Sequence, residues 1–223
     1  MKSLSITAAR VGMLGGLGLA LSLTTAATAS PKIYNLGGTD STGDPVANYN
    51  GDNPFLENGS TAYQDRVHVY REVPGPLVGD VYLETRNSDK GQANYSLSFD
   101  LAADVTLYLF VDNRMGDNDA SNGPKLGGGV MDWVAALGFK DTGMSIGVDE
   151  GNDGTVDNHS RVYSLNAVAG HYSFGAQNDT TAGGPGNRNM YAIACGEPVP
   201  EPATLALFGL GGFGLMMIAR KRK

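Results

Sequence analysis

Three aspartates between residues 149 and 157 have the type and spacing of a cation-binding loop. Asp149, Asp153 and Asp157 are interleaved with Gly and Asn in one short segment. Calcium takes several oxygen ligands from a turn opened by glycine, so the segment predicts a calcium site. It is not an EF-hand, because Gly151 stands at a ligand position and no bidentate Glu follows. The alternative is a solvated turn, which Asp, Asn and Gly also build.

A second set of residues has the chemistry of sugar binding. Tyr108 and Trp133 carry aromatic planes that can pack on sugar C–H groups, and Arg114 can donate hydrogen bonds to hydroxyls. These three residues form the candidate carbohydrate-binding set. The alternative places Trp133 in the core, where a lone tryptophan of a sandwich commonly lies. Arg114 would then pair with a loop carboxylate.

Catalytic motifs are not evident in the chain. It has no G-x-S-x-G, H-E-x-x-H or P-loop motif, and the spacing of His68, His159 and His171 suits no metal. We therefore expect a protein that is not an enzyme.

The elements that would position these residues are β-strands. Apolar residues alternate with polar ones at Tyr95, Leu97 and Phe99, and Gly, Asn and Asp clusters separate the short runs. Such patterns predict an all-β, jelly-roll-like sandwich. The expected strands are Val67–Val73, Val81–Thr85, Tyr95–Phe99, Val105–Val111, Arg161–Leu165, Tyr172–Gly175 and Met190–Ala194. Residues 30–62 are polar and turn-rich, and are either a strand with long loops or a loop-rich lead-in.

Charge and cysteine content exclude some classes of partner. The chain has 16 Lys and Arg against 23 Asp and Glu. Residues 30–197 hold 10 of these basic residues and 22 of the acidic ones. Such an acidic body argues against nucleic acid as a partner. Cys195 is the one cysteine, and we expect it buried at the end of the last strand.

The N-terminus has the composition of a secretory signal. Lys2 and Arg10 precede an uncharged run from Val11 to Leu23, and Ala27-Thr28-Ala29 then offers the small residues that a signal peptidase reads. The sequence predicts a signal peptide over residues 1–29, with Ala27 and Ala29 as its recognition positions.

The C-terminus has three successive parts. Pro200-Glu201-Pro202 precede an uncharged run over residues 203–219, which is long enough for a short transmembrane helix. The chain then ends in Arg220, Lys221, Arg222 and Lys223, a cluster that stays on the cytoplasmic side. The order of these parts resembles the PEP-CTERM sorting signal that exosortase-type enzymes read. The alternative is a permanent single-pass anchor.

The resemblance implies a processed, surface-sorted protein. It implies that the chain meets an exosortase-type enzyme, is held transiently in the inner membrane by residues 198–223, and then reaches the surface or the extracellular matrix. The predicted signal peptide adds signal peptidase as a partner. It further implies a Gram-negative bacterium that builds a polysaccharide matrix, so the expected localisation is the cell surface or a biofilm.

The body carries a second resemblance, looser than that of the tail. The order of Tyr108–Arg114, Trp133, Phe139–Gly143 and Gly170–Gly175 resembles β-sandwich modules of secreted polysaccharide-active proteins. This resemblance implies that residues 30–197 bind or organise extracellular polysaccharide. The alternative is a structural component of the envelope or biofilm that binds no glycan and is bridged by calcium.

Overall fold

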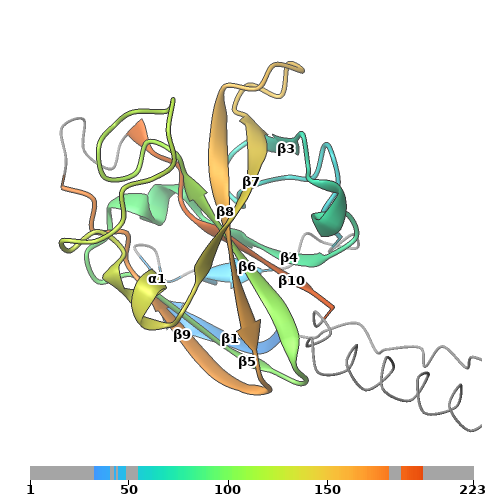
Figure 1. The fold of residues 1–223 in the computed structure, drawn as a ribbon, viewed down its shortest axis with the longest axis vertical. Helices are drawn as coiled ribbons and strands as arrows, with labels where there is room; N and C mark the ends of the chain where they lie inside the picture. The colour runs from blue at the N-terminus through green and yellow to red at the C-terminus, as the bar shows by residue number, and fades with distance from the viewer. Residues whose placement is uncertain (1–32, 41–42, 44, 49–54, 181–186, 198–223) are drawn as a thin grey trace, which may run out of the picture.

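A computed structural model describes residues 33–40, 43, 45–48, 55–180 and 187–197. Their strands form two antiparallel sheets, with the smaller sheet lying against the larger one (Figure 1). The smaller sheet has the order β1-β5-β9, and the larger has the order β2-β4-β10-β6-β8-β7-β3. The strands are β1 (Ile33–Thr39), β2 (Ala47–Asn48), β3 (Val69–Arg71), β4 (Val81–Thr85), β5 (Ser96–Leu101), β6 (Val105–Asp112), β7 (Lys140–Asp149), β8 (Asn158–Ala167), β9 (Gly170–Gly175) and β10 (Ala192–Gly196).

Helical structure in the described part of the chain is short. Two 3-10 turns, η1 (Gly75–Leu77) and η2 (Asn87–Gly91), flank β4. One α-helix, α1 (Asp132–Ala136), precedes β7. No helix among these residues is long and apolar enough to cross a membrane.

The space between the two sheets holds part of the core. Along β5 the burial alternates, with Leu97, Phe99 and Leu101 buried between half-exposed neighbours. This is the period-two pattern of a strand with one face on the core. Phe99 and Phe174 of neighbouring strands pack edge to face with centroids 5.3 Å apart.

The larger sheet curls on itself and encloses more apolar side chains. Tyr70 lies on the edge strand β3, yet its ring packs against Tyr82 of β4, with centroids 6.1 Å apart, and against Phe110 of β6, at 5.8 Å. These contacts cross the sheet, so its ends must bend toward each other. Bridges from Thr61 to Val69 and from Tyr63 to Thr85 connect both ends to one segment. Strands β4, β6 and β10 are therefore buried on both faces.

The all-β sandwich expected from the sequence is confirmed. The alternating runs match β4, β5, β6, β8, β9 and β10 within a few residues, and the expected strand at 67–73 is the shorter β3. The turn-rich lead-in contains β1 and β2. Cys195 is buried near the end of β10, as expected.

Candidate ligand-binding site

Trp133 lies in an aromatic cluster beside α1. Its ring stacks on Phe174 with centroids 5.0 Å apart and packs against Tyr191 at 5.2 Å. The indole Nε1 donates a hydrogen bond to the backbone oxygen of Ala176 at 3.1 Å. Trp133 is only partly buried, but both its ring and its polar atom are engaged within the protein.

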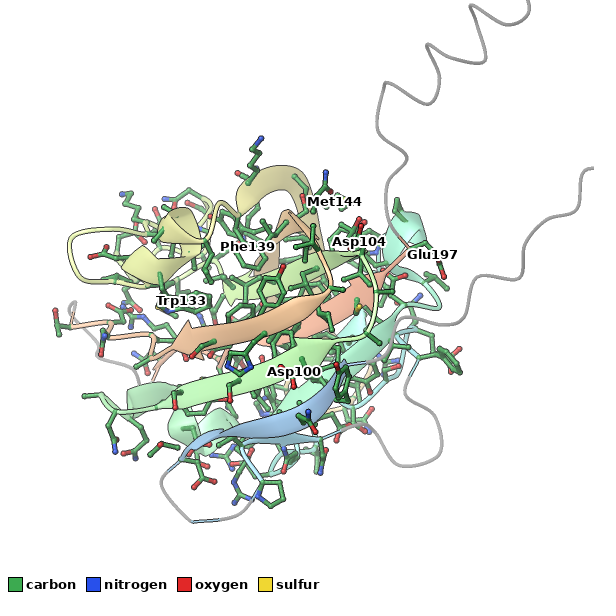
Figure 2. All side chains as sticks on the ribbon, turned by 90° about the horizontal axis from the view of Figure 1, so that it is seen from below. Asp100, Asp104, Trp133, Phe139, Met144 and Glu197 are labelled. Atoms are coloured by element: carbon green, nitrogen blue, oxygen red, sulfur yellow. The ribbon has the colours of Figure 1, made fainter. Side chains whose placement is uncertain are left out.

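Tyr108 lies elsewhere in the sandwich. It sits in the middle of β6 opposite Ala194, on the face that alternation separates from the Trp133 cluster. Burial raises its pKa, and the nearby Asp80 raises it further. Asp80 in turn neighbours Glu197, which lies far from Trp133 in Figure 2. The structure therefore does not bring Tyr108 and Trp133 together into one sugar-binding face.

Arg114, the third residue of the set, is held rigidly just beyond β6. Its Nε and backbone N–H both donate to Oδ1 of Asp112 at 2.9 Å, and Nη2 donates to Oδ2. The backbone N–H of Asn189 also donates to Oδ2 of Asp112, at 2.7 Å. Asp112 is 1% exposed. This buried carboxylate fixes the guanidinium and orients the chain that leads into β10.

Glu150 extends this network from the loop after β7. Its Oε1 accepts hydrogen bonds from Asn158 at 2.6 Å and from Asn189 at 3.0 Å. The guanidinium of Arg114 lies 3.5 Å from the same oxygen. Asn87 contacts the same segment. Its side-chain oxygen accepts a hydrogen bond from the backbone N–H of Met190, the residue after Asn189, at 2.8 Å.

These residues surround a polar hollow of about 240 Å³, which we call the basic hollow. Four cationic side chains, one carboxylate, a histidine and three amides line it. They are Arg66, His68, Asn87, Lys90, Arg114, Glu150, Asn187, Arg188 and Asn189. Five separate regions of the chain meet there: the loop before β3, η2, the loop after β6, the loop after β7 and the segment before β10.

Carboxylates behind the hollow form ion pairs with three of these cations; Asp112 and Asp179 are buried, and Asp65 is partly buried. Arg188 is 1% exposed, and its Nε lies 2.7 Å from Oδ2 of the buried Asp179. Asp65 accepts the backbone N–H of Asn87 at 2.7 Å and pairs with Arg66 at 3.0 Å. Side chains fixed in this way present donors to a ligand at little entropic cost.

Lys90 and His68 complete the wall. No other described residue forms an ion pair or hydrogen bond with the ammonium of Lys90. Burial lowers the pKa of Lys90, and the neighbouring Arg66 lowers it further. Burial also lowers the pKa of His68, which favours the neutral ring. Its Nδ1 is buried without a hydrogen-bond partner within the described part of the chain.

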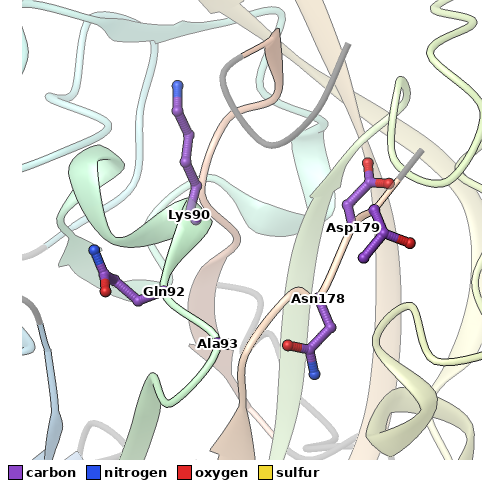
Figure 3. A pocket seen from close by; sticks show the side chains of 7 residues that line it. Lys90, Gln92, Ala93, Asn178 and Asp179 are labelled. Atoms are coloured by element: carbon purple, nitrogen blue, oxygen red, sulfur yellow. The ribbon is translucent and has the colours of Figure 1, made fainter. Parts of the chain in front are cut away.

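A second hollow of about 350 Å³ adjoins the first and shares Lys90 with it. Figure 3 shows it from close by, with Lys90 and Gln92 on one side and Asn178 and Asp179 on the other. Because one side chain lines both hollows, a ligand longer than one ring could contact both.

The aspartates of the expected calcium loop are engaged by the protein itself. Asp149 is fully buried and pairs with Arg71 at 3.1 Å, and its carboxylate also accepts the N–H groups of Asp153 and Gly154. Asp157 accepts the N–H of Glu150 at 2.7 Å. Across the described ranges, no group of three or more His, Cys, Asp and Glu is arranged to hold a metal. A calcium ion would have to displace these contacts, which argues against the predicted calcium site.

The sequence pointed to one residue of the basic hollow, Arg114. It missed Arg66, Lys90 and Arg188, which lie in separate segments of the chain. The sequence carried one signal for them: residues 30–197 contain only 10 basic residues, so a group of four at one place is a distinctive feature. Their convergence could be seen only in three dimensions.

Comparison with solved structures confirms the type of fold. The chain is similar to a beta-glucuronidase from glycoside hydrolase family 2, with a TM-score of 0.51 and 21% identity. The match covers 68% of this chain and 14% of the other, so the chain corresponds to a small part of that protein. At this identity the likeness shows a shared β-sandwich fold alone. No curated protein sequence matches the chain.

The C-terminal comparison is more specific. Residues 198–223 match the PEP-CTERM protein-sorting motif, which confirms the resemblance read from Pro200-Glu201-Pro202 and the basic end. The motif implies export, recognition by an exosortase-type enzyme, transient anchoring and surface localisation. The sorting residues, the expected helix 203–219 and the signal peptide 1–29 lie outside the described residues.

Proposed function

We propose that this exported protein binds extracellular polysaccharide through the basic hollow. One observation carries the proposal: a small hollow is lined by polar side chains, and buried carboxylates hold two of them, Arg114 and Arg188, in place. Sugars offer many hydroxyls that both donate and accept hydrogen bonds. Arg114 and Asn189 supply donors, and Glu150 supplies an acceptor.

Surface sorting and the neighbouring second hollow support a polymer as the ligand. A protein sorted to the cell surface is exposed to extracellular polymers. The two adjoining hollows, of about 240 and 350 Å³, offer successive positions for linked rings. Within this proposal Arg114 keeps its expected role, whereas Tyr108 and Trp133 do not contribute.

Retention on immobilised polysaccharides tests the proposal. The full chain in detergent is compared with Arg66→Gln, because Arg66 is a partly exposed side chain whose ion pair with Asp65 stabilises little. We expect retention of the wild type, weaker retention of the variant and equal melting temperatures. The matched control is Lys140→Gln, which removes an exposed cation outside the hollow. Retention that is the same for all three proteins would contradict the proposal.

A structural component that binds no glycan is the second candidate. The engagement of Trp133 by Phe174, Tyr191 and Ala176 favours it, because the only indole is then not offered to a sugar. Failure of the wild type to bind any polysaccharide would support this candidate.

A further inference from the structure

The distribution of cations in the body is uneven. Residues 30–197 contain 10 basic and 22 acidic residues. Four of the 10 basic residues, Arg66, Lys90, Arg114 and Arg188, line a single hollow of about 240 Å³. The same lining contains one carboxylate, that of Glu150. The side chains that line this hollow are therefore mostly basic, although Asp65, Asp112 and Asp179 form ion pairs with three of them.

The neutralising carboxylates lie behind the cations. Asp112 and Asp179 are buried: Asp112 accepts hydrogen bonds from Arg114, Asp179 forms an ion pair with Arg188, and both accept nearby backbone N–H groups. Their lone pairs are used within the protein, so the hollow is faced by donors. Lys90 forms no such ion pair among the described residues; Arg66 and Arg114 disfavour its charged form, whereas Glu150 and Asp112 favour it. An incoming anion would relieve that repulsion.

The single carboxylate of the lining limits how anionic the ligand can be. Glu150 and the acidic surroundings repel a densely charged polyanion. Glu150 can still accept a hydrogen bond from a sugar hydroxyl, since its bonds from Asn158 and Asn189 all reach Oε1. The hollow thus combines cations for one anionic group with an acceptor for a hydroxyl. A sugar ring that bears one carboxylate and several hydroxyls has the groups complementary to these.

We propose that the basic hollow recognises a carboxylate-bearing sugar of an acidic polysaccharide, with Lys90 and Arg66 binding the carboxylate and Glu150 a hydroxyl. This inference rests on the proposed function and names its ligand class. Lys90, shared by the two hollows, is placed to bind a charge between successive rings.

The test compares each acidic polysaccharide with its uncharged counterpart. The full chain in detergent is titrated with alginate, polygalacturonate and hyaluronate, and with the carboxyl-reduced form of each. We expect at least one acidic polymer to bind about tenfold more tightly than its reduced form, as a charge-assisted hydrogen bond requires. Added salt should weaken the binding of the acidic polymer more than the binding of its reduced form.

Two variants locate the effect. Lys90→Gln should remove the preference for the acidic form and leave the melting temperature unchanged, because Lys90 has no ion pair in the described structure. Lys140→Gln, which removes an equal charge at an exposed site on β7, should keep the preference. A preference that survives Lys90→Gln would overturn the role of Lys90.

The remaining outcomes separate this inference from the proposed function. Equal binding of acidic and reduced forms would overturn the inference and leave polysaccharide binding standing. Stronger binding of dextran sulfate than of any carboxylated polymer would overturn the choice of a carboxylate. Binding to none of these polymers, nor to neutral polysaccharides, would overturn both.

Discussion

Replacing Trp133 with alanine tests whether this side chain belongs to the core. Its ring packs on Phe174 and Tyr191, and its Nε1 bonds to the oxygen of Ala176. Each aromatic contact contributes about 1 kcal/mol, and the hydrogen bond contributes about as much again. We therefore expect Trp133→Ala to lower the free energy of unfolding by about 3 kcal/mol, at the lower end of the range for core aromatic residues because Trp133 is partly buried.

The assay is chemical denaturation followed by circular dichroism, since the variant has no tryptophan. For a domain of this size, the loss of about 3 kcal/mol expected for Trp133→Ala corresponds to a fall in melting temperature of roughly 6–12 °C. Trp133→Phe is the matched control: it keeps a ring against Phe174 but loses the Nε1 donor, so we expect a loss of about 1–2 kcal/mol. The wild-type indole should also emit at short wavelength and resist quenching by acrylamide.

A cost below about 1 kcal/mol for Trp133→Ala, of the size seen at exposed positions, would refute this reasoning. Red-shifted emission that a polysaccharide protects from quenching would refute it independently. Trp133 would then return to the sugar-binding set.

Three further predictions concern pH, calcium and processing. Burial and the nearby Glu197 raise the pKa of Asp80 from 3.8 to about 6, so the folded state holds this proton more tightly than the unfolded state, and stability falls as the pH rises from about 4 to 6. Asp80→Asn should thus stabilise the protein at pH 7 by about 1 kcal/mol, allowing for solvent screening, and denaturation curves at pH 4 should show no such gain. Because Arg71 and loop N–H groups already engage Asp149, we expect melting temperatures in millimolar calcium and in chelator to agree within about 1 °C; a rise that Asp153→Asn removes would restore the calcium site. The intact mass of extracellular protein should lack residues 1–29 and the sorting tail, and retention of the Ala203–Lys223 peptide on most molecules would contradict this.

Much of the fold could be predicted because its signals are local. A strand with one face on the core alternates its side chains, as β5 does at Leu97 and Phe99. A strand buried on both faces is almost continuously apolar, as β6 is. Strand β7 was not predicted. Its glycines at 143 and 147 and its exposed first half break the alternation, and its pairing with β8 and β3 stabilises it instead.

The ends of the chain and the character of the body could be read directly from the sequence. A sorting signal is a linear segment recognised by other proteins, so Pro200-Glu201-Pro202 and the basic end carry their meaning without a fold. Composition likewise establishes that the body is acidic and has one cysteine.

The basic hollow was decided by the tertiary structure alone. Lys90 lies in η2, Arg114 after β6 and Arg188 before β10, and nothing in their spacing along the chain relates them. They meet because β6 pairs with β10, which brings Asn189 to Asp112, and because η2 directly follows β4, the other neighbour of β10. Pairing between distant strands determines which loops lie together, and local residue patterns carry no record of it.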